Sequence, residues 1–78
     1  MRLIRRGERS LAVQDLQVRL ERLGFEVTPA ERGGIFGTGT EAAVRAFQQR
    51  RGLDVDGIVG RATWQELVES SWSLGDRL

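Results

Sequence analysis

Apolar residues recur at helical spacing in three stretches of the chain, and polar or charged residues fill the positions between them. The three stripes are, in chain order, Val13, Leu16, Leu20 and Leu23; Val44 and Phe47; and Trp64, Leu67 and Val68. Ser10 is a typical N-cap for the first helix, while Gly24 and Gly52 follow the first and second stripes as helix terminators. This pattern predicts three short helices.

Two glycine-bracketed loops separate the predicted helices. Residues 34–37 read Gly-Ile-Phe-Gly and residues 57–60 read Gly-Ile-Val-Gly, and a threonine follows three positions after each second glycine. Glycine permits sharp turns and close backbone approach, so we expect both residues of each apolar pair to point into the core. The short stretch before the second loop, residues 53–56, is expected to be extended without forming a sheet.

The helix before each loop carries the same residues, which indicates an internal duplication. Gln17 and Gln48 each follow a core anchor at matching places in the two halves. An amide group there suits hydroxyl or N-acetyl groups of a sugar, but a bridge from helix to neighbouring loop explains the symmetry more simply. We therefore favour the structural role, with sugar contact as the alternative.

Several Thr-x-x-Glu spacings predict where helical segments begin. Residues 28–31 predict one short helical turn, with Pro29 at its first position. Residues 38–41 and 63–66 predict capping boxes for the second and third helices. The fold expected from these elements is all-α: a compact bundle of three helices with a two-fold helix-loop repeat and long ordered glycine loops. Residues 1–9 are expected to be irregular, 10–69 to form the domain and 70–78 to be a linker.

Composition removes most catalytic chemistries. The 78 residues contain no cysteine and no histidine, and the net charge is only +1. No histidine, lysine or cysteine is available to activate a serine or threonine nucleophile. Asp54 and Asp56 do not fit a calcium loop, because glycine and threonine would stand at key ligand positions. Asp56 is expected to be a turn residue that accepts hydrogen bonds from loop amides.

The ordered series of residues resembles the peptidoglycan-binding domain 1 family. The resemblance runs over roughly residues 7–68 and rests on Ala12-Val13, Leu16-Gln17, Leu20, Leu23-Gly24-Phe25, Gly34-Ile35-Phe36-Gly37, Thr40, Ala43-Val44, Phe47-Gln48, Gly52-Leu53, Asp56-Gly57-Ile58-Val59-Gly60, Thr63-Trp64 and Leu67. It implies a three-helix orthogonal bundle without catalytic residues, cofactor or metal, attached to a cell-wall hydrolase such as an N-acetylmuramoyl-L-alanine amidase. The tail at residues 74–78 resembles the link to a second copy of the domain.

Surface arginines near the loops are the favoured ligand-binding candidates. Peptidoglycan peptides carry free carboxylates, which the planar guanidinium group binds in a bidentate manner. We select Arg61, Arg45 and Arg32, with exposed Gln49 and with Phe36 at the rim. A solvated charged surface is the simpler interpretation for each of them taken alone. Trp64 is expected in the core rather than stacked on a sugar.

The expected function is a non-catalytic module that targets an attached hydrolase to peptidoglycan or a muropeptide. The module is expected to be a monomer with neither a nucleic-acid nor a membrane partner. Its expected location is the cell wall if it belongs to an exported protein; the charged start, residues 1–6, shows no signal peptide and also allows a cytoplasmic location. The alternative is an intracellular protein-interaction or regulatory domain that keeps the fold without glycan binding. A DNA-binding bundle is a distant third, because the net charge is nearly neutral.

Overall fold

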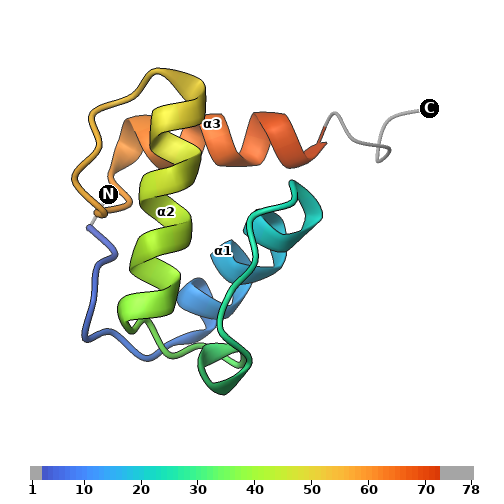
Figure 1. The fold of residues 1–78 in the computed structure, drawn as a ribbon, viewed down its shortest axis with the longest axis vertical. Helices are drawn as coiled ribbons and strands as arrows, with labels where there is room; N and C mark the ends of the chain where they lie inside the picture. Colours follow the sequence, from blue (N-terminus) through green and yellow to red (C-terminus); the bar gives the residue numbers. More distant parts are fainter. Residues whose placement is uncertain (1–2, 73–78) are drawn as a thin grey trace.

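Three helices lie across one another at steep angles (Figure 1). The computed structural model describes residues 3–72, with α1 at Leu11–Arg22, α2 at Thr38–Arg51 and α3 at Arg61–Trp72. A 3-10 turn, η1, spans Pro29–Glu31 at the place where a short helical turn was predicted. The three-helix bundle is therefore confirmed. Of the predicted linker at residues 70–78, residues 70–72 belong to α3, while residues 73–78 and the side chain of Trp72 lie outside the described part of the chain.

The ends of α1 and α2 follow the sequence signals. The Ser10 Oγ accepts a hydrogen bond from the Val13 amide at 3.2 Å, so Ser10 is the N-cap of α1. Gly24 and Gly52 adopt φ angles of 93° and 75°, in the left-handed region that favours glycine at a helix end. Both predicted terminators are confirmed.

The predicted capping boxes of α2 and α3 are wrong. Each helix begins directly after the closing glycine of its loop: α2 at Thr38, the first position of the expected range 38–41, and α3 at Arg61, two residues before Thr63. Thr38 is consequently the first helical residue of α2, and the N-cap Gly37 has no side chain to offer. Thr63 is the third residue of α3, and its hydroxyl accepts a hydrogen bond from a buried glutamine. These threonines are thus inside the helices rather than in front of them.

The core lies where the three helices meet. Its buried apolar side chains are Ile4, Val13, Leu16, Leu20, Val27, Phe36, Ala43, Val44, Phe47, Val59 and Leu67. Phe25 packs on this core and meets Phe47 edge to face, with ring centroids 5.7 Å apart. Trp64 also packs against it while staying partly exposed. Within residues 3–72, every helix is too short or too polar to cross a membrane.

Only one residue of each loop's apolar pair is buried. Phe36 and Val59 are 1% and 0% exposed, whereas Ile35 is 40% exposed and Ile58 is partly exposed. Both loops run extended at these positions, where Ile35 and Val59 form antiparallel bridges. Successive side chains of an extended backbone point to opposite sides, so an adjacent pair cannot enter the core together. The expectation that both members point inward is corrected accordingly.

The N-terminal segment ties the two loops together. Ile4 exchanges two backbone hydrogen bonds with Val59 in the second loop, of 3.1 and 2.8 Å. Further along, Gly7 donates to the Phe36 carbonyl and Glu8 accepts from the Phe36 amide in the first loop. Ile4 is only 5% exposed, and at the other end of the chain Ser71 is 1% exposed. The packed unit therefore includes residues on both sides of 10–69.

Candidate functional site

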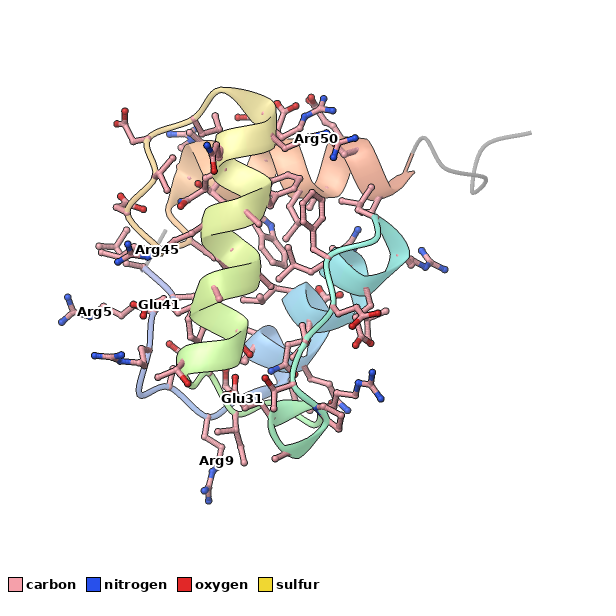
Figure 2. The ribbon with its side chains drawn as sticks, viewed as in Figure 1. Arg5, Arg9, Glu31, Glu41, Arg45 and Arg50 are labelled. Carbon is pink, nitrogen blue, oxygen red and sulfur yellow. The ribbon has the colours of Figure 1, made fainter. Side chains whose placement is uncertain are left out.

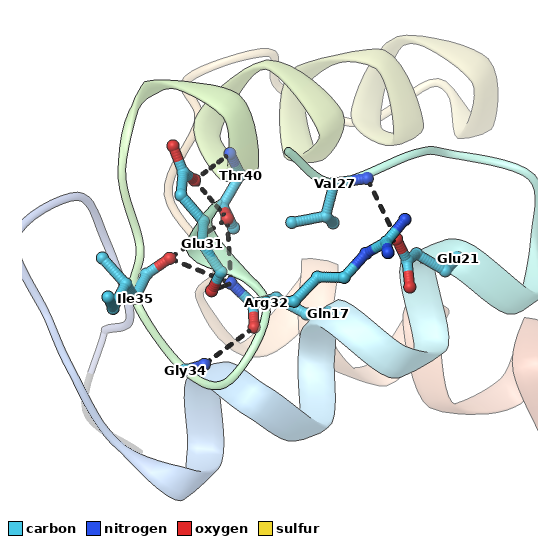
Figure 3. A network of polar contacts seen from close by, with 8 residues as sticks. All are labelled: Gln17, Glu21, Val27, Glu31, Arg32, Gly34, Ile35 and Thr40. Carbon is cyan, nitrogen blue, oxygen red and sulfur yellow. Dashed lines mark hydrogen bonds and ion pairs between the residues drawn. The ribbon is translucent and has the colours of Figure 1, made fainter. Parts of the chain in front are cut away.

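Gln17 holds the first loop against α1 (Figure 3). Its Nε2 donates to the carbonyls of Glu31 and Ile35 and to the Thr40 hydroxyl, at 2.8, 2.9 and 3.0 Å. Its Oε1 accepts from the Gly34 amide at 3.1 Å. Gly34 has a φ of 112°, and a Cβ there would lie 2.6 Å from a backbone oxygen of residue 10, so the turn requires glycine.

Gln48 holds the second loop against α2 in nearly the same way. Its Nε2 donates to the Ile58 carbonyl, the Thr63 hydroxyl and the Asp56 carboxylate, at 3.0, 3.1 and 2.9 Å. Its Oε1 accepts from the amides of Asp56 and Gly57. The two glutamines therefore form equivalent clamps in the two halves of the chain.

The clamps are structural parts of the fold. Gln17 and Gln48 are 2% and 1% exposed, and loop atoms occupy their amide groups. An apolar replacement would leave buried loop amides and carbonyls without partners, at a cost of about 1–3 kcal/mol for each. The predicted role as a bridge between helix and loop is confirmed.

Glu31 closes the N-terminus of α2. Its carboxylate accepts hydrogen bonds from the amides of Gly37, Gly39 and Thr40, at 3.1, 2.9 and 2.7 Å, and from the Thr40 hydroxyl at 2.7 Å. Partial burial raises the pKa of Glu31, but the bonds from Thr40, Gly39 and Gly37 outweigh it, and the pKa lies below its ordinary value. The charge is also placed favourably at the positive end of the helix dipole.

The N-terminus of α3 has the same backbone arrangement without such a carboxylate. The Trp64 amide donates to the Gly60 carbonyl at 2.9 Å, as Glu41 does to Gly37 in α2. Among residues 3–72, however, no group accepts a hydrogen bond from the amides of Gly60, Ala62 or Thr63. These three amides correspond to the three that Glu31 binds in the first half.

An open hollow of about 460 Å³ lies at this end of α3. The first turn of the helix lines one part of it, and the apolar side chains of Leu3, Leu53 and Ile58 line another. Asp54 and Asp56 are the acidic residues in its lining. The hollow therefore combines helix-end amides with an apolar wall and with charged groups at its edge.

Asp56 is turned toward its own loop. Its carboxylate accepts from the Ile58 amide and from Gln48, both at 2.9 Å. These two bonds lower the pKa of Asp56, desolvation opposes them, and the nearby Arg45 lowers the pKa further. The predicted turn role is confirmed. Asp54, in contrast, is exposed and has no hydrogen-bond or ion-pair partner within the described range 3–72.

Three of the predicted site residues lie at or beside the second loop. Arg61 is the first residue of α3 and lines the hollow. A Cβ on Gly57 would lie 2.9 Å from the Arg45 Nε, which places that side chain against the loop. Gln49 follows one helical turn after Arg45, so both are on one face of α2. All three are exposed, and none is hydrogen-bonded or ion-paired through its side chain to another residue of the described chain.

The structure separates the other two predicted site residues from this group. Arg32 lies between η1 and the first loop, where its Nε is 2.9 Å from the Glu21 carboxylate (Figure 3). Phe36 was expected at the rim but is 1% exposed, because its side of the extended loop faces the core. Phe36 is therefore corrected from a rim residue to a core residue.

Sequence reasoning missed two charged residues around the loops. Arg5 lies on the same side of the molecule as Arg45 in Figure 2, because the bridge between Ile4 and Val59 brings the N-terminal segment to the second loop. Glu31 was assigned to a short local turn, yet its carboxylate caps a helix that begins seven residues later. The duplication was the available signal, since it aligns Glu31 with Asp54 and so places an acidic residue three positions before the first glycine of each loop.

A second hollow, of about 610 Å³, follows the outer face of α3. Residues at helical spacing line it: Arg61, Trp64, Gln65, Val68 and Glu69. The Arg19 guanidinium lies 5.8 Å from the centre of the Trp64 ring and donates to the Ser71 hydroxyl at 2.8 Å. Trp64 thus packs on the core and under Arg19, which leaves only part of it facing this groove.

The chain is similar in sequence and structure to several known proteins. The family described as "Putative peptidoglycan binding domain" matches residues 9–67. The N-acetylmuramoyl-L-alanine amidase CwlM of Mycobacterium tuberculosis is 43% identical over 95% of the chain, and a spore cortex-lytic enzyme of Bacillus cereus is 42% identical over 88%. The chain spans only 20% and 26% of these two relatives. The crystal structure of the SleB N-terminal domain matches with a TM-score of 0.83 at 41% identity, over 90% of this chain and 93% of that one.

Proposed function

Because the chain belongs to the peptidoglycan-binding domain family, we propose that it is a non-catalytic module that binds peptidoglycan and holds an attached hydrolase at its substrate. The relatives support this assignment through their names, an amidase and a cortex-lytic enzyme. Most of each relative lies outside the matched segment, which leaves room for a separate catalytic part. The proposed place of action is the cell wall.

The surface around the second loop is the proposed binding surface. The observation that carries this choice is the cluster of Arg45, Gln49 and Arg61, whose exposed side chains form no hydrogen bond or ion pair with another residue of 3–72. Guanidinium groups bind carboxylates of the peptidoglycan peptide, and the amide of Gln49 suits hydroxyl and N-acetyl groups. Arg32 is a weaker candidate, because Glu21 already engages it.

Binding by this surface alone is expected to be weak. Exposed ion pairs contribute only about 0–1 kcal/mol each, because water and salt screen them. A polymer such as peptidoglycan offers the same chemical group many times, and an attached domain adds a second contact. Effective affinity then rises through multivalency rather than through one tight site.

Co-sedimentation with purified sacculi tests the function, and NMR titration with a soluble muropeptide locates the surface. We expect the domain to pellet with sacculi and the amide resonances around residues 45, 49 and 53–63 to shift. Arg45→Gln and Arg61→Gln should each weaken binding about two- to fivefold, in line with one exposed ion pair.

Arg9→Gln is the matched control, because it removes the same charge from an exposed arginine beside the first loop. Figure 2 shows Arg9 well away from Arg45. Equal losses in all three variants would reduce the effect to net charge and remove the proposed surface. No pelleting, together with no shifts at millimolar muropeptide, would contradict peptidoglycan binding and favour an intracellular protein-interaction domain.

A further inference from the structure

The two helix starts that follow the loops differ in one respect. At the start of α2, three amides and one threonine hydroxyl bind a carboxylate that the chain itself provides, that of Glu31. At the start of α3, the equivalent amides have no acceptor within the described residues, and the helix end opens into the hollow. The first half thus shows which chemical group this backbone arrangement binds.

We propose that the start of α3 binds a free carboxylate of the peptidoglycan peptide, in the manner in which α2 binds Glu31. The amides of Gly60, Ala62 and Thr63 and the Thr63 hydroxyl are the donors. A helix N-terminus binds anions because its first amides are unpaired and the helix dipole is positive there. This inference rests on the proposed function, and it specifies the chemical group that the second loop recognises.

The Thr63 side chain gives evidence that is independent of the helix end. Thr63 is 6% exposed and lines the hollow, and its Oγ1 accepts a hydrogen bond from Gln48 at 3.1 Å. Its hydrogen is therefore left to donate, and no acceptor for it exists within residues 3–72. Thr40 accepts from Gln17 in the same way, at 3.0 Å, and donates its hydrogen to Glu31 at 2.7 Å. A buried donor without an acceptor is costly, and a bound carboxylate supplies what is missing.

The charges in the hollow are compatible with an anion at this position. Arg61 begins the helix and has no partner in the described chain, so it is available to the same carboxylate. Asp56 is turned away toward the Ile58 amide and Gln48, and Arg45 compensates part of its charge. Asp54 is the remaining negative charge in the lining, and from the edge of the hollow it repels a bound anion.

The apolar wall limits what is attached to the carboxylate. Leu3, Leu53 and Ile58 line the hollow, and the Leu3 side chain lies next to Gly60, where an added Cβ would be 3.2 Å from its Cδ2. Leu3 is 55% exposed, so its packing surface is incomplete. A short aliphatic side chain on the ligand, next to its carboxylate, would cover the exposed surface of Leu3. The chemistry that fits is a small apolar amino acid with a free carboxyl group.

The decisive experiment compares a muropeptide whose peptide ends in a free carboxylate with the same muropeptide amidated at that carboxyl group. Amidation removes the charge and one acceptor oxygen but keeps the sugar and the peptide. We expect it to weaken binding about tenfold, as the loss of a charged hydrogen-bond acceptor does. In the NMR titration, the amides of Gly60, Ala62 and Thr63 should move downfield with the acid and stay near their free positions with the amide.

Variants test the donors and the sign of the charge. Thr63→Val should weaken binding of the acid about fivefold, whereas Thr40→Val removes the equivalent hydroxyl in the first half and should leave binding unchanged. Asp54→Asn should tighten binding about two- to threefold and Arg61→Gln should weaken it, because the ligand group is an anion. Opposite signs for these two charge variants would show that the hollow binds a cation.

The failures of the inference and of the proposed function are distinguishable. Equal affinity for acid and amide, or ligand shifts that avoid the start of α3, would overturn the carboxylate site while peptidoglycan binding stands. Absence of binding to both muropeptides and to sacculi would overturn the function and the inference together. If Thr63→Val does not fold, the comparison of acid and amide on the unaltered chain decides the question.

Discussion

The two halves of this domain share a loop clamp but differ in how the following helix begins. In each half, a buried glutamine binds a carbonyl, a threonine hydroxyl and a glycine amide of the loop. In the first half Glu31 then covers the helix start, whereas in the second half the helix start opens into a hollow. The clamp therefore defines the repeat, and the cap distinguishes its two copies.

This difference separates structural from functional residues inside one small molecule. Groups that are satisfied in both halves, such as Gln17 and Gln48, serve the fold. A group that is satisfied in one half and open in the other, such as the Thr63 hydroxyl, is available to a ligand. Each half therefore acts as an internal reference for the other.

Substitution of Phe36 should have the largest effect, because it tests which member of a loop pair supports the fold. Phe36 is fully buried, and Phe36→Ala should lower the free energy of unfolding by about 3–5 kcal/mol. Ile35→Ala, one residue earlier and 40% exposed, should cost less than about 1 kcal/mol. Urea unfolding measures both. Similar losses would show that the pair packs inward as a unit, as the sequence had suggested.

Glu31→Gln should have the next largest effect, because it tests the closed helix start. The variant keeps one acceptor oxygen but puts an NH2 group near amide donors, and it loses the charge at the positive end of the helix. We expect a loss of about 1.5–3 kcal/mol in the free energy of unfolding, the range for hydrogen bonds to charged groups. Thermal and urea unfolding provide the measurement.

Asp54→Asn is the matched change before the second loop. Asp54 stands three residues before Gly57, as Glu31 stands three residues before Gly34, but it is exposed and caps nothing. The expected change in stability is within about 0.5 kcal/mol, as for other surface substitutions. Comparable losses in the two variants would mean that α3 is also capped from within the chain, and the contrast between the halves would disappear.

The periodic part of this fold was predictable from sequence. Helical spacing located all three helices, and Ser10, Gly24 and Gly52 marked ends that the structure confirms. The role of the two glutamines followed from the duplication. A glutamine that recurs beside a core anchor in both halves is explained if each one makes the same kind of hydrogen bond to the loop of its own half. Such signals are either local patterns or internal repeats, and both can be recognised in a single sequence.

The unpredicted features depend on the path of the loops in space. Glu31 reaches α2 only because η1 turns the chain back toward Gly37, and the sequence does not specify that path. Ile4 stands next to Leu3 in an arginine-rich segment without periodicity, so nothing local indicates that Ile4 enters the core while Leu3 stays exposed. The alternation that exposes Ile35 and buries Phe36 requires knowing that the loop is extended there.

Gly39→Ala should have a smaller effect than Glu31→Gln, and it tests whether the close approach of Thr28 to α2 requires glycine at this position. An added Cβ would overlap the Thr28 Oγ1 and lie 2.7 Å from the Thr28 Cβ, so the segment around Thr28 would have to shift. We expect a loss of about 1–2 kcal/mol, typical of overpacking. Its counterpart in α3 is already alanine, and Ala62→Gly should cost about 0.5–1 kcal/mol through backbone entropy alone.

Rescue distinguishes a clash from a change in helix propensity at Gly39. If Thr28 is the obstacle, the double variant with Thr28→Gly should recover part of the stability lost in Gly39→Ala. Circular dichroism melts of the single and double variants measure this recovery. No recovery would place the cost in the helix itself and remove the close approach as the reason for glycine.

Acid should destabilise the domain mainly through the closed half, in which Glu31 caps α2. The pKa values of Glu31 and Asp56 are lowered in the folded state, so the unfolded chain binds more protons and stability falls as the pH drops. The loss of stability should begin near the pKa values of the unfolded chain, about 4.3 for glutamate and about 3.9 for aspartate, and continue below them.

Glu31 accepts four hydrogen bonds, whereas Asp56 accepts two, from Ile58 and Gln48. Glu31→Gln should therefore flatten the pH dependence of the urea midpoint more than Asp56→Asn. Equal flattening would mean that the carboxylate of the second loop stabilises its half as strongly as Glu31 stabilises the first.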